Sequence, residues 1–124
     1  MKHLYLKGAR SERELLHFLN FKGFSCGRIA SSGGTLTPVD IIAMKKGLIL
    51  GFEIKAHKNK PKLDKNKLQK LREWCERAGA IGFLAWKAPG NRWLFLRAED
   101  AEAERYDDEN WIEMESLLDA LDII

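Results

Sequence analysis

Cysteine, proline and long apolar runs are all scarce in this chain of 124 residues. The two cysteines, Cys26 and Cys75, stand in unrelated contexts, so neither a disulfide framework nor a metal-binding cysteine motif follows from them. No apolar run approaches the roughly 18 residues that span a bilayer. Residues 1–5 lack the apolar core of a signal peptide. We therefore expect a soluble protein in a reducing, cytoplasmic setting, with no membrane partner.

Acidic residues are scarce in the first part of the chain, and basic residues are scarce in the last. Residues 1–75 hold 16 Lys and Arg against 6 Asp and Glu, whereas residues 76–124 hold 5 against 12. The net charge of +3 is therefore the sum of a basic N-terminal part and an acidic C-terminal part. A basic N-terminal part indicates a polyanionic partner, with nucleic acid as the first candidate. We expect the acidic segment 98–124 to lie away from that partner.

The apolar pattern predicts one α/β domain over residues 1–124, in which helices flank a mixed central β-sheet. The expected elements are a helix over about 8–22, a strand over 24–29, a hairpin of 40–44 and 48–55, a helix between Asp64 and Gly79, strands over 80–86 and 93–96, and a short helix through 117–121. The start of the first helix stays open. Ser11 with Glu14 can form a capping box, or the helix begins near Gly8.

Three charged residues of the predicted hairpin suit catalysis. Glu53 and Lys55 are two apart on one strand, so their side chains share a face, and Asp40 opens the neighbouring strand. Neighbouring carboxylates repel each other, and a hard divalent cation such as Mg²⁺ relieves that repulsion through oxygen ligands. Lys55 then lies where an ammonium group orients an attacking water or stabilises negative charge. The alternative is a same-face ion pair on an exposed strand.

Glu12 is a fourth candidate, because it continues the apolar helical stripe of Leu15, Leu16 and Leu19. A carboxylate on an apolar face is costly without a partner. A metal shared with Asp40 and Glu53, directly or through water, would provide one. The strand that carries Glu53 is otherwise apolar, which predicts a central place in the sheet and favours the catalytic interpretation.

Several of these segments resemble the archaeal-type Holliday junction resolvases. The segments are Lys7–Leu16 with its Lys-Gly-x-x-x-Glu-Arg-Glu pattern, Gly23-Phe24 followed by Arg28–Gly33, Asp40–Ala43, and Phe52–Lys55. The last two match the nuclease core of the wider superfamily with the restriction-endonuclease fold, whereas the opening and the serine loop are more specific to the resolvases. The resemblance covers about residues 7–97.

The resemblance implies a restriction-endonuclease-like fold and a metal-dependent endonuclease that cuts four-way junction DNA as a two-fold symmetric homodimer. Glu12, Asp40 and Glu53 would bind Mg²⁺, with Mn²⁺ able to substitute, and Lys55 would be the catalytic lysine. Ser32 would be a loop serine near the scissile phosphate. Because the stretch before Asp40 is longer than in the family, the neighbouring Ser31 is the alternative for this role. Arg13 and Arg28 would bind DNA. From the basic character of the chain near the site, we add Arg10, Ser31, Lys58, Lys60 and Lys62 to the predicted DNA-binding set.

Two further features each allow two interpretations. Between residues 55 and 72 the chain has eight basic residues and only one acid, Asp64. These basic residues form either a solvated surface or a surface that follows the phosphates of a nucleic acid. Trp74 lies off the apolar stripe of its predicted helix. It is either an exposed dimer anchor or part of a wide core face.

The leading functional prediction is a Mg²⁺-dependent junction resolvase acting in DNA recombination and repair. One alternative keeps the nuclease core but cuts flaps, repair intermediates or duplex sites. Its weakness is that the chain has no room for a separate specificity domain. The other alternative is a non-catalytic nucleic-acid-binding module, which the complete set of Glu12, Asp40, Glu53 and Lys55 disfavours.

Overall fold

The elements follow the predicted order, with one added strand. The structure is a computed structural model, and it describes residues 2–30, 36–61, 64–101 and 110–122. The elements are α1 (Lys2–Phe21), β1 (Ser25–Arg28), β2 (Ile41–Lys45), β3 (Leu48–Lys55), α2 (Lys65–Ala78), β4 (Ile81–Ala88), β5 (Arg92–Arg97), β6 (Ile112–Glu113) and α3 (Met114–Asp122). The added strand is β6, which pairs with β5. Within these ranges no helix is long and apolar enough to cross a bilayer.

The described strands form one mixed sheet in the order β1-β2-β3-β4-β5-β6. Only β3 and β4 run parallel, and the other neighbouring pairs are antiparallel. Lys46 and Gly47 turn the β2–β3 hairpin with φ of 50° and 86°, the left-handed pair that suits the twist of a two-residue hairpin turn. The predicted interior position of β3 is confirmed, because strands flank it on both sides.

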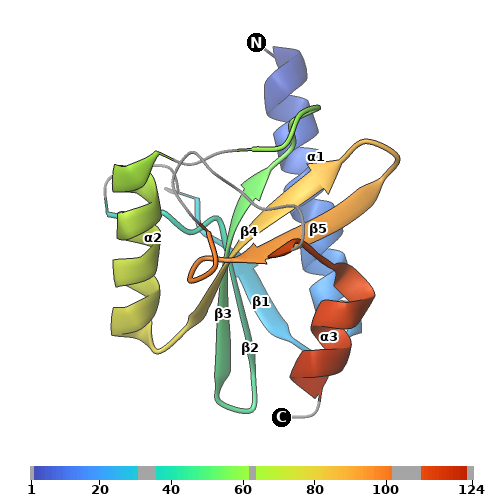
Figure 1. Ribbon diagram of the computed structural model, residues 1–124. Helices are drawn as coiled ribbons and strands as arrows, with labels where there is room; N and C mark the ends of the chain where they lie inside the picture. The colour runs from blue at the N-terminus through green and yellow to red at the C-terminus, as the bar shows by residue number, and fades with distance from the viewer. Residues whose placement is uncertain (1, 31–35, 62–63, 102–109, 123–124) are drawn as a thin grey trace.

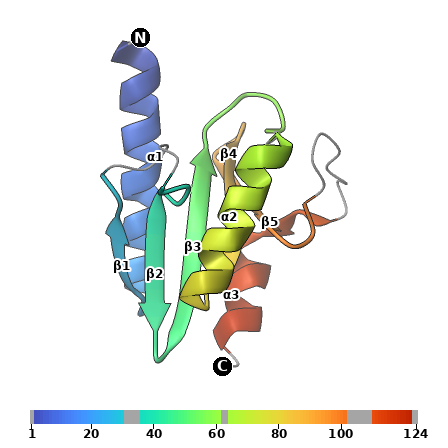
Figure 2. The ribbon, with the colours of Figure 1, turned by 90° about the vertical axis from the view of Figure 1, so that its left-hand side faces the viewer.

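Helices cover both faces of the sheet, with α1 and α3 on one face and α2 on the other (Figures 1 and 2). Phe52 of β3 belongs to the core under α1 and α3. A side chain at Gly51 would instead touch Trp74 and Cys75 of α2. Because side chains alternate along a strand, Glu53 and Lys55 project from the α2 face. The predicted fold class is therefore confirmed.

Helix α1 begins earlier than either sequence interpretation allowed, so the proposed capping box is wrong. The helix starts at Lys2, which places Ser11 in its interior with 4% of its surface exposed. Glu14 instead accepts a hydrogen bond from the Trp93 indole at 3.2 Å and pairs with Lys87. These partners lie 79 and 73 positions further along the chain, so no local pattern could reveal them.

Helix α2 has the predicted limits. The Asp64 carboxylate caps it by accepting from the Lys67 N–H at 2.8 Å, and Gly79 ends it in the left-handed region. Leu68, Leu71 and Cys75 form its buried stripe, as the spacing predicts. The cap fixes the first turn of α2 directly after the basic loop that follows β3.

Gly82 in β4 lies where α2 packs closely on the sheet. A Cβ atom there would lie 2.7 Å from the Cys75 sulfur and 3.3 Å from the Ala98 Cβ. We expect Gly82→Ala to lower the free energy of unfolding by roughly 1–3 kcal/mol through overpacking, measured by urea denaturation. Gly27→Ala is the matched control, because a Cβ at Gly27 meets nothing within 4 Å. Unchanged stability of Gly82→Ala would contradict this close packing.

Candidate active site

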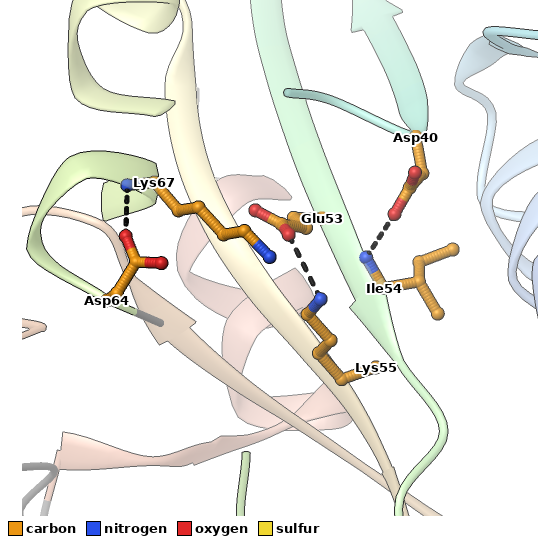
Figure 3. Close-up of polar contacts among 6 residues, drawn as sticks. All are labelled: Asp40, Glu53, Ile54, Lys55, Asp64 and Lys67. Carbon is orange, nitrogen blue, oxygen red and sulfur yellow. Dashed lines mark hydrogen bonds and ion pairs between the residues drawn. The ribbon is translucent and has the colours of Figure 1, made fainter. Parts of the chain in front are cut away.

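Asp40 stands just before β2 and is held by β3 through two hydrogen bonds. Its N–H donates to the Phe52 carbonyl at 2.8 Å, and its Oδ2 accepts from the Ile54 N–H at 2.7 Å (Figure 3). Ile54 lies between Glu53 and Lys55 in the chain. The side-chain bond therefore fixes the Asp40 carboxylate beside these two residues, as the hairpin predicted.

Glu53 and Lys55 project together from β3, and their Oε1 and Nζ atoms are 3.2 Å apart (Figure 3). Their side chains are only 13% and 23% exposed, respectively. Burial is the largest cause that raises the pKa of Glu53 above its usual 4.5, and the charge of Asp40 adds to it. Lys55 opposes this rise in pKa. The pair is therefore a largely buried one on an interior strand, and the alternative of an exposed surface pair does not hold.

Lys67 is a residue of this site that the sequence analysis did not single out. Its side chain extends from the first turn of α2 toward Glu53, and its positive charge lowers the pKa of Glu53 (Figure 3). Asp64 fixes the start of this turn through the capping bond to the Lys67 N–H. In the sequence Lys67 is one of many basic residues, and its place in the first turn after the predicted cap was the only available signal.

Glu12 approaches the group from α1. Its Oε2 atom lies 3.5 Å from the Arg28 guanidinium, and its side chain is 22% exposed. Burial is the main cause that raises the pKa of Glu12, the charge of Asp40 raises it further, and Arg28 lowers it. The charge of Asp40 thus acts on both Glu12 and Glu53, so these acids from three separate segments share one electrostatic environment.

The acids supply hard oxygen ligands without forming a complete metal cage. Within the described ranges, no group of three or more His, Cys, Asp and Glu side chains lies close enough to hold a metal ion together. Mg²⁺ usually keeps several waters and needs only one or two carboxylates. The repulsion between Asp40 and Glu53 is the feature that a divalent cation would relieve. The donor set therefore fits such an ion, and the third ligand, Glu12, stays a prediction.

The structure places only part of the predicted DNA-binding and dimer residues. Arg10, Arg13 and Lys58 are exposed, Lys60 is partly exposed, and Arg28 pairs with Glu12. Ser31, Ser32 and Lys62 lie outside the described residues. Trp74 is partly buried against the core under α2, which agrees with the interpretation of a wide core face.

Comparison with known proteins gives a consistent result. A family described as "Archaeal holliday junction resolvase (hjc)" matches residues 3–123. The crossover junction endodeoxyribonuclease Hjc of Methanocaldococcus jannaschii is 41% identical over 97 residues, which are 77% of this chain and 69% of that protein. The Hjc of Archaeoglobus fulgidus is 34% identical over 77% of this chain and 72% of its own length.

A solved structure extends the likeness to the fold. The structure of Archaeoglobus fulgidus Hjc, described as a Holliday junction resolvase, superposes with a TM-score of 0.77. The match has 26% sequence identity and covers 91% of this chain and 96% of that one. The arrangement of the mixed sheet and its helices is therefore shared over nearly the whole length.

We expect Glu53→Gln to stabilise the protein at neutral pH. Folding raises the pKa of Glu53, so the folded state favours the protonated carboxyl, and ionisation costs stability. This cost is absent below the usual pKa of 4.5 and grows as the pH rises through the raised value. The neutral amide avoids the cost, so its stabilising effect should appear over that interval and persist above it.

Thermal unfolding of the wild type and Glu53→Gln from about pH 4 to 8 checks this expectation. Glu76→Gln on the exposed side of α2 is the control. A gain in melting temperature that is equal at all pH values, or equally large in the control, would contradict the assigned cause.

Proposed function

The chain belongs to the archaeal Holliday junction resolvase family, and on this premise we propose that Asp40, Glu53 and Lys55 carry out its cleavage of DNA. As a member of that family, the protein is an endodeoxyribonuclease that resolves four-way junctions in recombination and repair. The observation that carries the assignment of residues is the Ile54–Asp40 hydrogen bond, which holds the Asp40 carboxylate against the backbone between Glu53 and Lys55.

The reaction is the hydrolysis of a phosphodiester bond. A water oxygen attacks the phosphorus, the bond to the 3′ oxygen breaks, and the products carry a 5′-phosphate and a 3′-hydroxyl. The Lys55 ammonium has three donors, of which one faces Glu53 at 3.2 Å. The other donors are available to a phosphate oxygen or to the attacking water, where a fixed positive charge stabilises the transition state.

Asp40 and Glu53 are the carboxylates that would hold a divalent ion, for which we propose Mg²⁺ with Mn²⁺ as a substitute. When bound, such an ion supplies a Lewis acid that neutralises charge on the scissile phosphate. The chain's own residues perform the positioning. Ile54 orients Asp40, Lys55 and Lys67 hold Glu53 between two cations, and Glu12 contributes a further carboxylate from α1.

DNA contacts outside the reacting phosphate are proposed for residues on both sides of the site. Arg10, Arg13 and Arg28 come from α1 and β1, whereas Lys58 and Lys60 come from the loop between β3 and α2. We include Ser31, Ser32 and Lys62 from the sequence argument alone. Contacts from guanidinium and ammonium groups to phosphates carry no sequence information, which suits recognition of a junction by shape.

The enzyme is proposed to act as a homodimer, because one active site cannot cut two opposed strands together. A two-fold axis between protomers would match the symmetry of the junction. The part of Trp74 that remains exposed beside the α2 core is the proposed contact. This role is compatible with its packing, since an anchor at an interface is commonly a partly buried aromatic side chain.

A cleavage assay tests the function. Labelled four-way junction, flap and linear duplex are incubated with the wild-type protein, with and without Mg²⁺. We expect paired, symmetric cuts in the junction alone, and none without a metal. Equal cutting of all three substrates would contradict junction selectivity. Binding without cutting in any metal would favour a non-catalytic module.

Asp40→Asn should abolish cleavage and preserve junction binding. The amide oxygen can still accept the bond from the Ile54 N–H, so the strand connection survives while the charge is lost. Cleavage is expected to fall by at least about 100-fold, as for the loss of a principal transition-state group. Asp64→Asn, which preserves the cap of α2, is the matched control and should cut normally. An active Asp40→Asn variant would refute the assigned site.

Sedimentation equilibrium tests the assembly, with an expected mass of twice the 14.2 kDa of one chain. Trp74→Ser should shift the mass toward the monomer, whereas Glu73→Ser on the same helix should not. A dimer that persists in folded Trp74→Ser would place the interface elsewhere.

A further inference from the structure

A pocket that the cleavage mechanism does not use opens beside the catalytic strand. It has a volume of about 390 Å³, within the range of roughly 300–1,000 Å³ typical of small-ligand sites. Its walls combine two tryptophans, one leucine and three charged residues. They are Lys60, Trp86, Arg92, Leu94, Trp111 and Glu113.

The strand register places the pocket next to the active site. Lys55 of β3 is the register partner of Trp86 in β4, and Trp86 is in turn the partner of Leu94 in β5. Neighbouring strands lie about 4.8 Å apart, so the pocket begins one strand away from Lys55. A DNA strand held at Lys55 that runs across the sheet toward β5 would reach the pocket within about one nucleotide.

Two aromatic rings give the pocket surfaces on which a planar base can lie. The Trp86 and Trp111 rings have centroids 5.6 Å apart and planes inclined at 64°, so a flat ring can stack on one and touch the other with its edge. Trp86 is 9% exposed and forms the buried floor, and its Nε1 donates to the His57 carbonyl at 2.9 Å. Trp111 is only half-buried and is therefore the ring better placed to take a base.

The charged residues of the pocket suit the remaining parts of a nucleotide. Lys60 belongs to the basic loop after β3, and Arg92 stands at the start of β5. Both are cations suited to a phosphate. Glu113 pairs with Arg92 at 2.8 Å on the exposed rim, and a carboxylate there can accept from the amino group of a base.

We propose that this pocket takes one unstacked nucleotide of the junction, adjacent to the scissile phosphate, with its base against Trp111 and its phosphate near Lys60 and Arg92. The inference rests on the proposed function, because it needs the DNA strand to run past Lys55. Unstacking costs least for a base whose pairing is already disturbed, and the branch point is the place in a four-way junction where we expect such a base. Stacking is tolerant of sequence, so the pocket would favour distorted DNA without reading a code.

A cycle that combines one protein change with one DNA change tests the proposal. Single abasic sites are placed at successive positions around the cut, and junction binding is measured at one salt concentration in the presence of a chelator. At one position the loss of the base should weaken binding to the wild type by about 5- to 150-fold, the measured range for one stacked base. The same abasic site should have no effect on Trp111→Leu.

Trp111→Leu removes the ring and keeps an apolar side chain, while Trp111→Phe is the matched control that restores a ring. Phenylalanine should recover most of the response to the abasic site. Trp111→Leu should leave the salt dependence of binding unchanged, whereas Lys60→Ala should reduce its slope by about one phosphate contact. Abasic penalties that are equal in the wild type and Trp111→Leu at every position would overturn the proposal.

A second measurement needs no variant. Iodouracil placed at the responsive position of the junction should cross-link the wild-type protein at Trp111 or Trp86, as mapped by mass spectrometry. Cross-links confined to residues outside the pocket would overturn the proposal.

The outcomes remain distinct from those of the cleavage assay. A wild type that cuts the intact junction but shows neither coupling nor cross-link refutes the pocket alone, and one that cuts nothing refutes the function.

Discussion

The hydrogen bond from the Ile54 N–H to the Asp40 carboxylate connects the strands that carry the site. Through it, a side chain continues the β2–β3 ladder one step past the last backbone pair, and the negative charge of Asp40 is fixed beside Glu53. This placement is electrostatically unfavourable, because the negative charge of Asp40 raises the pKa of both Glu53 and Glu12. The fold holds like charges near one another, and two lysines reduce the resulting repulsion at Glu53.

The two apolar cores explain how the protein sustains this arrangement. Phe52 anchors β3 in the core under α1 and α3, and the next residue, Glu53, emerges on the α2 face beside Leu84 of β4. The strand therefore has little freedom to move its charges apart. Destabilising groups at the site are balanced by close packing elsewhere, for example at Gly82, where the Cys75 side chain leaves no room for a Cβ atom.

The basic and acidic segments of the chain lie in different parts of the fold. The basic loop and the first turn of α2 surround the α2 face of β3, where Lys55 and Lys67 lie near Glu53. Helix α3, with Glu115 and Asp119, packs on the opposite face of the sheet, and its separation from bound DNA stays a prediction. Glu113 departs from this separation, since it lines the pocket beside the site, and residues 102–109 lie outside the described ranges.

Local sequence determined much of this protein. Alternation along residues 48–55 placed Glu53 and Lys55 on one face of the strand. The stripe of Leu68, Leu71 and Cys75 predicted α2. The motifs around Glu12 and Asp40 indicated the family that the comparisons confirm. Such features depend on periods of two or 3.6 residues and on caps, which neighbouring residues set.

Only the tertiary structure decided the rest. In the fold, Glu14 contacts Trp93 and Lys87 and does not cap α1. The side chain of Lys67 lies near Glu53. Trp86 and Trp111 pack against each other beside the active strand. These contacts join residues from 14 to 79 positions apart in the sequence. Their partners are chosen by strand order and by the packing of helices on the sheet, and no local period encodes either of these.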